Sequence, residues 1–182
     1  MIEHLSLQGA KLIDIKRLPD NRGWFSETFK ETWISDLDIP SNFVFEFWSY
    51  NVDRGTLRGL HSQIGDTAPG KLIQVLTGAI QDVIVDAREN SPTYGRWLSI
   101  ELSAKQPKLL YVPRGFYHGY VTLEPETYVG YKVDQYRTPQ DECGVSWNDP
   151  TLNIQWALDR EPIISHRDST NPLWTAAAKF QL

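Results

Sequence analysis

The stretch KLIQVLTGAIQDVIVD, residues 71–86, is the part of the sequence that decides the fold. It holds two runs rich in Val, Ile and Leu, separated by the short segment 77–79 with Gly78 at its centre. Glycine takes the positive φ of a tight turn without steric cost, so the pattern predicts two strands joined as a β-hairpin. Strand side chains alternate between two faces, which places Lys71 with Ile73 on one face and Asp82 with Ile84 on another. We therefore expect one lysine and one aspartate among apolar neighbours.

Short runs of the same kind continue along the chain. We expect strands over 96–102, 108–112, 117–123 and 128–136, with a turn at 91–95. Many short strands at such spacing are typical of an all-β sandwich or barrel. One helix, Glu27 to Leu37, is expected outside the sheets. From Trp147 onward prolines interrupt the pattern, so we expect an irregular C-terminal segment that packs on the barrel and can carry a catalytic residue into a site.

Composition narrows the class of protein. The chain has 182 residues, 41% of them hydrophobic, and we expect one domain over 1–182. Acidic residues number 23 against 18 basic ones, with no basic block to follow a phosphate backbone, so nucleic-acid binding is not expected. No apolar run reaches the ~20 residues that a membrane helix needs. A single cysteine, Cys143, and an N-terminus without a signal-like pattern predict a cytoplasmic protein.

Two of the four histidines lie in short segments marked by glycine and arginine, LRGLHSQ at 57–63 and VPRGFYHG at 112–119. A histidine in a strand is most often simply hydrogen-bonded, but a glycine beside a polar side chain marks where a ligand or another backbone comes close. A metal site on a strand needs ligands at positions i and i+2, and His61 is followed by Ser62 and Gln63. We therefore expect no metal and no other cofactor.

His61, Lys71 and Tyr131 together carry the functional groups for proton transfer next to a carbonyl. A neutral imidazole accepts a proton, an ammonium stabilises the enolate oxygen, and a phenol acts as acid on the opposite face. The alternatives are that Lys71 is a solvated strand end and that Tyr131 is a packing aromatic. Arg22 and Arg58 both precede a glycine, a pattern that suits a diphosphate ligand, although a surface turn explains Arg22 equally well.

Several segments occur in a characteristic order between Leu12 and Leu173. They are DNRGWFSE (20–27), LRGLH (57–61), GKL (70–72), DVIVDAR (82–88), SPTYG (91–95), PRGFYHG (113–119), YK (131–132) and WNDP (147–150). In this order the sequence resembles the dTDP-4-dehydrorhamnose 3,5-epimerase family. The resemblance implies a cupin jelly-roll without metal, and a homodimer that shares an N-terminal strand. It also implies an epimerase that inverts C3 and C5 of a nucleotide-linked 4-keto-6-deoxyhexose, converting dTDP-4-dehydro-6-deoxy-D-glucose to dTDP-4-dehydro-L-rhamnose.

The same resemblance assigns roles to individual residues. His61 is implied as the base, Asp168 as its orienting partner, Lys71 as the group that stabilises the enolate, and Tyr131 as the acid. Substrate-binding positions are implied for Arg22, Glu27, Arg58, His118, Glu142 and Arg167, the last of which stands where the family usually has lysine.

Departures from the family pattern bear on the substrate. Phe45 and Phe47 stand where amide side chains usually touch the nucleotide, and Arg137 stands where an aromatic side chain usually stacks on the base. A guanidinium also stacks on a base, so all three are expected in the binding site. Tyr117, where a small residue is usual, would narrow the cavity if it pointed inward. A second hypothesis is therefore an epimerase for another nucleotide or for a single carbon. A third is a non-catalytic sugar-nucleotide binding protein, which is expected to lack the base or its partner.

Overall fold

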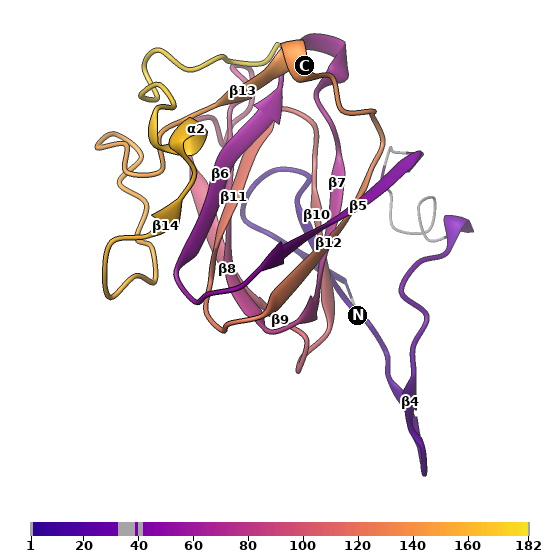
Figure 1. The fold of residues 1–182 in the computed structure, drawn as a ribbon. Coiled ribbons are helices and arrows are strands. Elements are labelled where there is room, and N and C mark those ends of the chain that lie inside the picture. The colour runs from indigo at the N-terminus through magenta and orange to yellow at the C-terminus, as the bar shows by residue number, and fades with distance from the viewer. Residues whose placement is uncertain (1, 33–38, 40–41, 182) are drawn as a thin grey trace.

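Strands make up most of the regular structure. The computed structural model describes residues 2–32, 39 and 42–181, and Figure 1 shows two curved sheets that face one another. The strands are β1 (Ile2–His4), β2 (Lys11–Asp14), β3 (Leu18–Asp20), β4 (Gly23–Phe25), β5 (Phe45–Asn51), β6 (Thr56–Gln63), β7 (Lys71–Thr77), β8 (Ala79–Asp86), β9 (Trp97–Ser103), β10 (Lys108–Val112), β11 (Phe116–Thr122), β12 (Thr127–Val133), β13 (Glu142–Gly144) and β14 (Ile163–Ile164). Helical segments with described bounds are the 3-10 turns Gly65–Thr67 and Pro139–Asp141, and the one-turn helix α2 (His166–Ser169).

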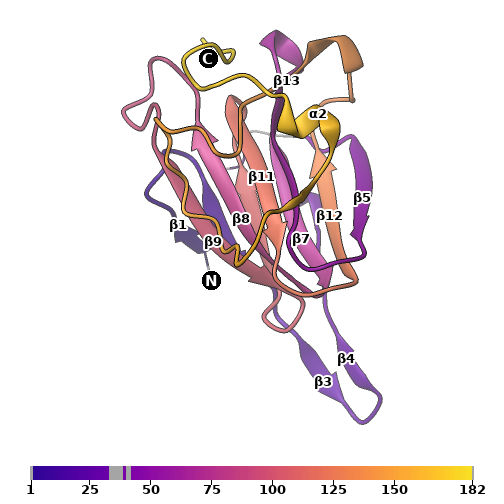
Figure 2. The same ribbon diagram turned by 60° about the vertical axis from the view of Figure 1, so that its left-hand side comes forward.

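The order of the strands defines a jelly-roll. One sheet runs β1-β2-β10-β7-β12-β5 and the facing sheet runs β13-β6-β11-β8-β9, with β14 parallel to β6. Strands that follow one another in the chain repeatedly fall in opposite sheets, as in the double-sheet jelly-rolls. A separate hairpin of β3 and β4 projects from this body (Figure 2). The prediction of an all-β jelly-roll with short peripheral helices is confirmed for the described residues.

The two strands predicted around Gly78 are present, but they do not pair with each other. β7 lies between β10 and β12, whereas β8 lies between β11 and β9 in the facing sheet. Gly78, at φ +76°, turns the chain from one sheet to the other, and a Cβ there would lie 2.2 Å from Thr127 Oγ1. The predicted β-hairpin is therefore wrong. Each strand pairs with segments distant in sequence, and stacking the two sheets buries both inner faces.

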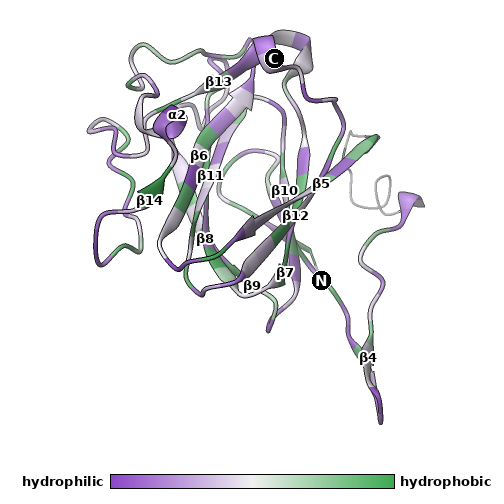
Figure 3. Ribbon diagram, viewed as in Figure 1, coloured by the Kyte–Doolittle hydropathy of each residue, from purple (hydrophilic) through white to green (hydrophobic). Residues whose placement is uncertain are grey.

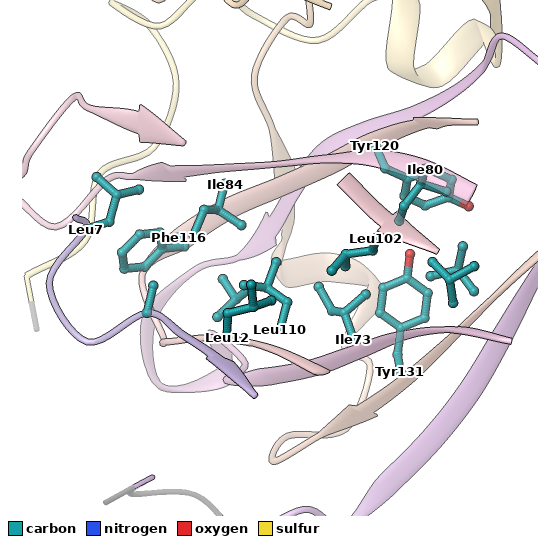
Figure 4. Packing of buried hydrophobic residues seen from close by; sticks show 14 residues of the cluster. Leu7, Leu12, Ile73, Ile80, Ile84, Leu102, Leu110, Phe116, Tyr120 and Tyr131 are labelled. Carbon is teal, nitrogen blue, oxygen red and sulfur yellow. The ribbon is translucent and has the colours of Figure 1, made fainter. Parts of the chain in front are cut away.

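The predicted faces of β7 and β8 are confirmed, because both turn inward. Figure 4 shows Ile73, Ile80 and Ile84 among the buried side chains packed between the sheets. The buried residues of this cluster are Leu7, Ala10, Leu12, Ile73, Val75, Ile80, Ile84, Leu102, Leu110, Val112, Phe116, Tyr120, Val129 and Tyr131. Lys71 and Asp82 are buried on the same inner faces, as the alternation predicts. The interior of the barrel is thus largely apolar, and Lys71 and Asp82 are among the few polar side chains that enter it.

The irregular C-terminal segment packs on the outer face of the second sheet, as expected. Trp174 and Phe180 join Val83 and Val85 in a second buried cluster. Tyr117 belongs to this outer cluster, and its hydroxyl donates a hydrogen bond to the Ala178 carbonyl at 2.9 Å. Tyr117 therefore points away from the interior and does not narrow the cavity.

The largest differences from the predicted bounds are at the end of one strand and in the predicted helix, whereas the other predicted strand bounds agree within one residue. The strand expected over 128–136 ends at Val133, because the backbone bends and Asp134 accepts hydrogen bonds from the Gly70 N–H at 2.7 Å and Arg114 Nε at 2.9 Å. In the helix expected from Glu27 to Leu37, residues 27–30 are irregular and 31–32 are helical, and the remainder lies outside the described residues. In the part of the chain that the structure describes, no helix is long and apolar enough to cross a membrane.

Candidate active site

A cavity of about 470 Å³ lies between the two sheets, a size that suits a small-molecule ligand. Figure 3 shows hydrophilic and hydrophobic residues following one another along β6, which contributes one wall. The lining residues are Phe45, Phe47, Ser49, Arg58, His61, Ser62, Gln63, Pro69, Lys71, His118, Tyr120, Tyr131, Val133, Gln135, Arg137, Glu142, Ser165, Arg167 and Asp168. All the site residues expected from the sequence are among them except Arg22 and Glu27.

His61 and Asp168 form a hydrogen-bonded pair at this wall. The distance between His61 Nε2 and Asp168 Oδ1 is 2.6 Å, and Asp168 Oδ2 accepts the backbone N–H of Gly59 at 3.0 Å. Burial alone would raise the pKa of the Asp168 carboxyl, but the hydrogen bonds from His61 and Gly59 outweigh it and hold this pKa below its ordinary value. The carboxylate is therefore ionised, fixes the orientation of the imidazole, and would stabilise it as a cation.

Local structure explains how Asp168 reaches β6 from a distant part of the chain. β14 pairs with the start of β6, which anchors the segment that leads into α2. Ser165 then caps the single turn of α2, its hydroxyl accepting the Asp168 N–H at 3.1 Å. The capped turn directs the Asp168 side chain toward His61.

Gly59 and Gly119 lie near the two histidines in the sequence, and the structure shows why glycine is needed at both positions. Gly59 has φ +110°, and a Cβ there would lie 2.7 Å from Gly119 Cα and from the His118 carbonyl oxygen. The register of β6 and β11 shifts at this point, between His118 and Tyr120. The expected close approach is therefore between two backbones, and it sets His61 and His118 opposite each other on neighbouring strands.

Lys71, Asp82 and His118 form a buried polar group inside the barrel. Lys71 Nζ donates to the His61 carbonyl at 3.3 Å, and His118 Nε2 lies 2.8 Å from Asp82 Oδ2. Burial lowers the pKa of Lys71 to about 8, opposed by the negative charge of Asp82. Burial also lowers the pKa of His118. The reading of Lys71 as a solvated strand end is therefore wrong.

Tyr131 is both a packing residue and a lining residue. It belongs to the interior cluster, and its ring stacks on Phe47 with a centroid distance of 4.7 Å. Its hydroxyl is near enough to those of Tyr120 and Ser49 for both to influence its pKa. Burial raises the pKa of Tyr131 well above its ordinary value, so the phenol is protonated at neutral pH.

Three guanidinium groups line the cavity. Glu142 accepts hydrogen bonds from Arg137 Nε at 2.5 Å and from Arg167. Arg58 Nε donates to Asn51 Oδ1 at 2.8 Å. Burial would raise the pKa of Glu142, but the two arginines lower it below its ordinary value. The arrangement leaves a net positive charge suited to an anion such as a diphosphate.

An aromatic wall lies beside the arginines. Phe45 contacts Phe47 at a ring-centroid distance of 5.6 Å and Tyr136 at 6.1 Å. Both phenylalanines line the cavity, and a flat ligand could stack against this wall.

Arg22 and Glu27 lie outside the cavity of this single chain. Arg22 sits at the tip of the projecting β3–β4 hairpin and pairs with Asp20 at 2.6 Å (Figure 2). Glu27 pairs with Lys30 at 2.7 Å. The structure of one chain therefore does not bring these two predicted binding residues to the others.

Some lining residues were not predicted from the sequence. Tyr120 and Gln63 each follow a predicted site histidine by two positions, so the alternation of strand faces could have identified them. Ser49 follows Phe47 in the same way. Residues 2–32, 39 and 42–181 contain no cluster of three His, Cys, Asp or Glu side chains that could hold a metal ion.

Fold and site together define a jelly-roll enzyme whose cavity carries a carboxylate-paired imidazole, a buried ammonium and a phenol, the groups that remove and return a proton beside a carbonyl. A family model described as dTDP-4-dehydrorhamnose 3,5-epimerase matches residues 4–176. The chain belongs to this family, whose members are epimerases and therefore isomerases, with the cupin form of the jelly-roll.

Individual relatives agree with this assignment. A dTDP-4-dehydrorhamnose 3,5-epimerase of Sinorhizobium fredii is 39% identical over 170 residues, covering 93% of this chain and 87% of the relative. The crystal structure of the Bacillus anthracis enzyme with TDP and PPi bound is 42% identical, with a TM-score of 0.92 and coverage of 95% and 98%. A dTDP-6-deoxy-D-glucose-3,5-epimerase of Legionella pneumophila in complex with dTDP-4-keto-L-rhamnose is 32% identical, with a TM-score of 0.94 and coverage of 100% and 99%.

Proposed function

We propose that this chain inverts C3 and C5 of dTDP-4-dehydro-6-deoxy-D-glucose and so produces dTDP-4-dehydro-L-rhamnose. The observation that carries the proposal is the pair of His61 and Asp168 at the wall of a cavity that also contains Lys71 and Tyr131. Family membership supports the substrate class.

In the proposed reaction His61 is the base. Its Nε2 is bonded to Asp168, so Nδ1 is the nitrogen that takes the proton from the sugar carbon next to the C4 ketone. The C–H electrons move into an enolate, whose oxygen the Lys71 ammonium stabilises as negative charge develops. Tyr131 then delivers its proton to the opposite face of the same carbon, which inverts it. The same cycle at the second carbon completes the conversion.

The remaining lining residues would hold the nucleotide. Arg58, Arg137 and Arg167 offer guanidinium groups to the diphosphate, and Glu142 keeps the latter two in a fixed orientation. The aromatic wall of Phe45, Phe47 and Tyr136 offers a stacking surface for the base.

We further propose a homodimer in which the β3–β4 hairpin of one subunit reaches the cavity of its partner. Arg22 would then complete the diphosphate site in the partner's cavity. Glu27, which comes just after β4 in the chain, would lie on the same projecting segment. The hairpin projects from the body of its own chain and exposes Leu18, Trp24 and Phe25, a large apolar surface for so short a segment (Figure 2). In this proposal, residues 1–182 form one domain per subunit.

Deuterium exchange tests the main proposal. The wild type is incubated in D₂O with dTDP-4-dehydro-6-deoxy-D-glucose, and NMR follows the label at C3 and C5. We expect label and inversion at both carbons, and a loss of at least about a hundredfold in His61→Asn. His4→Asn, in the exposed strand β1, is the matched control. Exchange at the wild-type rate in His61→Asn would contradict the assignment of the base.

A second candidate is an epimerase of the same mechanism for another nucleotide or for one carbon. The phenylalanines and Arg137 at the nucleotide end of the cavity favour it, since their side chains differ from the amides and aromatic usual in the family. Label at only one carbon in the same experiment would select the single-carbon form.

A further inference from the structure

The hydroxyl of Tyr120 lies beside that of Tyr131 inside the barrel. The two side chains enter the interior from opposite sheets, Tyr120 from β11 and Tyr131 from β12, and Figure 4 shows both among the buried residues between the sheets. Figure 4 shows the two side chains extending toward each other, and their hydroxyls are near enough for each to influence the pKa of the other. Tyr120 is only 1% exposed, and the mechanism proposed above gives its hydroxyl no task.

Tyr120 continues into a chain of hydrogen bonds. Its hydroxyl lies 2.9 Å from Ser49 Oγ and donates to Asn51 Oδ1 at 3.1 Å. Asn51 Oδ1 also accepts from Arg58, while Asn51 Nδ2 donates to the Thr127 carbonyl at 3.0 Å, so the amide is held in one orientation. With Tyr120 donating to Asn51, its oxygen is left to accept from Ser49. Ser49 is only half-buried and lines the cavity, so the hydroxyl chain ends where water can reach it.

The proposed reaction creates a need for such a chain. Each inversion leaves His61 with one extra proton and Tyr131 with one too few. Two inversions of one substrate therefore require Tyr131 to be reprotonated between them. The ring of Tyr131 is stacked on Phe47 and its hydroxyl faces Tyr120 and Ser49, so a proton reaches it most directly through these two hydroxyls.

We propose that Tyr120 and Ser49 relay a proton from cavity water to Tyr131 between the two inversions, an inference that rests on the proposed function. Once Tyr131 has given up its proton, the Tyr120 O–H turns from Asn51 to the Tyr131 oxygen, and the Tyr120 O–H bond breaks as the Tyr131 O–H bond forms. Tyr120 takes the hydroxyl proton of Ser49, and Ser49 takes one from water. The hydroxide left behind is neutralised by the proton that His61 removed from the sugar, so the net transfer is from His61 to Tyr131.

The electrostatic setting favours this direction. Burial raises the pKa of Tyr131, and it also raises the pKa of Tyr120. A tyrosinate at position 131 is therefore a strong base.

Tyr120→Phe tests the relay, because it removes the hydroxyl and keeps the buried ring. One round of inversion can use the proton already on Tyr131, so we expect the first inversion near the wild-type rate. The second inversion should slow by at least about tenfold, and singly inverted sugar should accumulate in a single turnover. Ser49→Ala should slow the second inversion less, since Tyr120 also lines the cavity.

Tyr117→Phe is the matched control, because it also removes the hydroxyl of a fully buried tyrosine but acts in the outer cluster. It should leave both inversions unchanged. The relay is overturned if Tyr120→Phe leaves the second inversion at the wild-type rate. It is also overturned if both inversions slow equally with a raised KM, the result expected if Tyr120 only supports Asn51 and Arg58. A wild-type protein without any exchange on the keto sugar would instead refute the proposed function.

Discussion

The carboxylate of Asp168 lies 2.6 Å from the imidazole Nε2 of His61, although 107 positions separate the two residues in the chain. One oxygen of this carboxylate is hydrogen-bonded to the imidazole, and the other accepts a hydrogen bond from the backbone N–H of Gly59. The same side chain thus orients the proposed base and anchors the C-terminal segment to β6.

Replacement of Asp168 by asparagine keeps the shape of the side chain and removes its charge. The imidazolium formed on proton abstraction would lose its counter-charge, so we expect kcat to fall about a hundredfold or more with little change in KM. Steady-state kinetics on the keto sugar measure both. Asp159→Asn, which removes an exposed carboxylate paired with Arg54, is the control and should retain wild-type kcat. Equal kcat values for the two variants would contradict the role of Asp168.

The rate should fall on the alkaline side as Lys71 loses its proton. The pKa of Lys71 is lowered to about 8 by burial, and the ammonium that stabilises the enolate is present only below that pH. We therefore expect kcat to decrease as the pH rises through about 8. Asp82 raises the pKa of Lys71, so Asp82→Asn should move the decrease to lower pH.

A profile of kcat from about pH 6 to about pH 10, roughly two units on each side of the Lys71 pKa, measures this shift. Lys71→Met should lower kcat at every pH and abolish the alkaline decrease. A profile of Lys71→Met that still falls near the same pH would assign the titration to another group and contradict the role of Lys71.

Dimers that combine two different variants test whether the β3–β4 hairpin of one subunit reaches the cavity of its partner. Arg22→Ala and His61→Asn should each be poorly active alone. A dimer of the two variants has one cavity with intact His61 that receives the intact Arg22 of the other subunit. After subunit exchange at equal amounts, about a quarter of all cavities should be complete, and activity should recover accordingly. If mass spectrometry verifies subunit exchange but activity does not recover, the proposal that the hairpin reaches the partner's cavity is contradicted.

Nucleotide preference is measured by thermal shift with dTDP, UDP, GDP and CDP. A ligand at a hundred times its Kd stabilises by about 2.7 kcal/mol, which raises Tm by roughly 5–10 °C for a chain of this size. We expect the largest shift with dTDP. Phe47→Leu should reduce it, because the ring lines the cavity, whereas Trp48→Leu on the opposite face of β5 should not. A larger shift with another nucleotide would favour the second candidate function.

The strands could be predicted from the sequence, but their partners could not. The alternation in 71–86 correctly places Lys71 and Asp82 among apolar side chains. It carries no information on which strand lies next to which, because pairing depends on how the chain passes between the sheets. A turn with Gly78 at positive φ serves a hairpin and a sheet-to-sheet connection equally well. For this reason the predicted hairpin was wrong although both strands were right.

Among the site residues, too, some could be predicted from the sequence and others could not. His61, Lys71 and Tyr131 could be proposed from their chemical groups and their strand faces. Asp168 came only from family resemblance, since nothing local to an irregular segment indicates which wall it reaches. Tyr120 was missed although it follows His118 by two positions, because a tyrosine in a strand is ordinary until its hydroxyl is seen beside another.

The bond between Gly59 and Asp168 has a consequence for the order of events during synthesis. Strands that build the cavity are complete by β13, yet the proposed base has no carboxylate beside it until α2 has docked on β6. A nascent chain that ends before residue 168 therefore has every strand that lines the cavity but no carboxylate beside the proposed base. The pairing of His61 with Asp168 can form only after the C-terminal segment has been synthesised and has docked on β6.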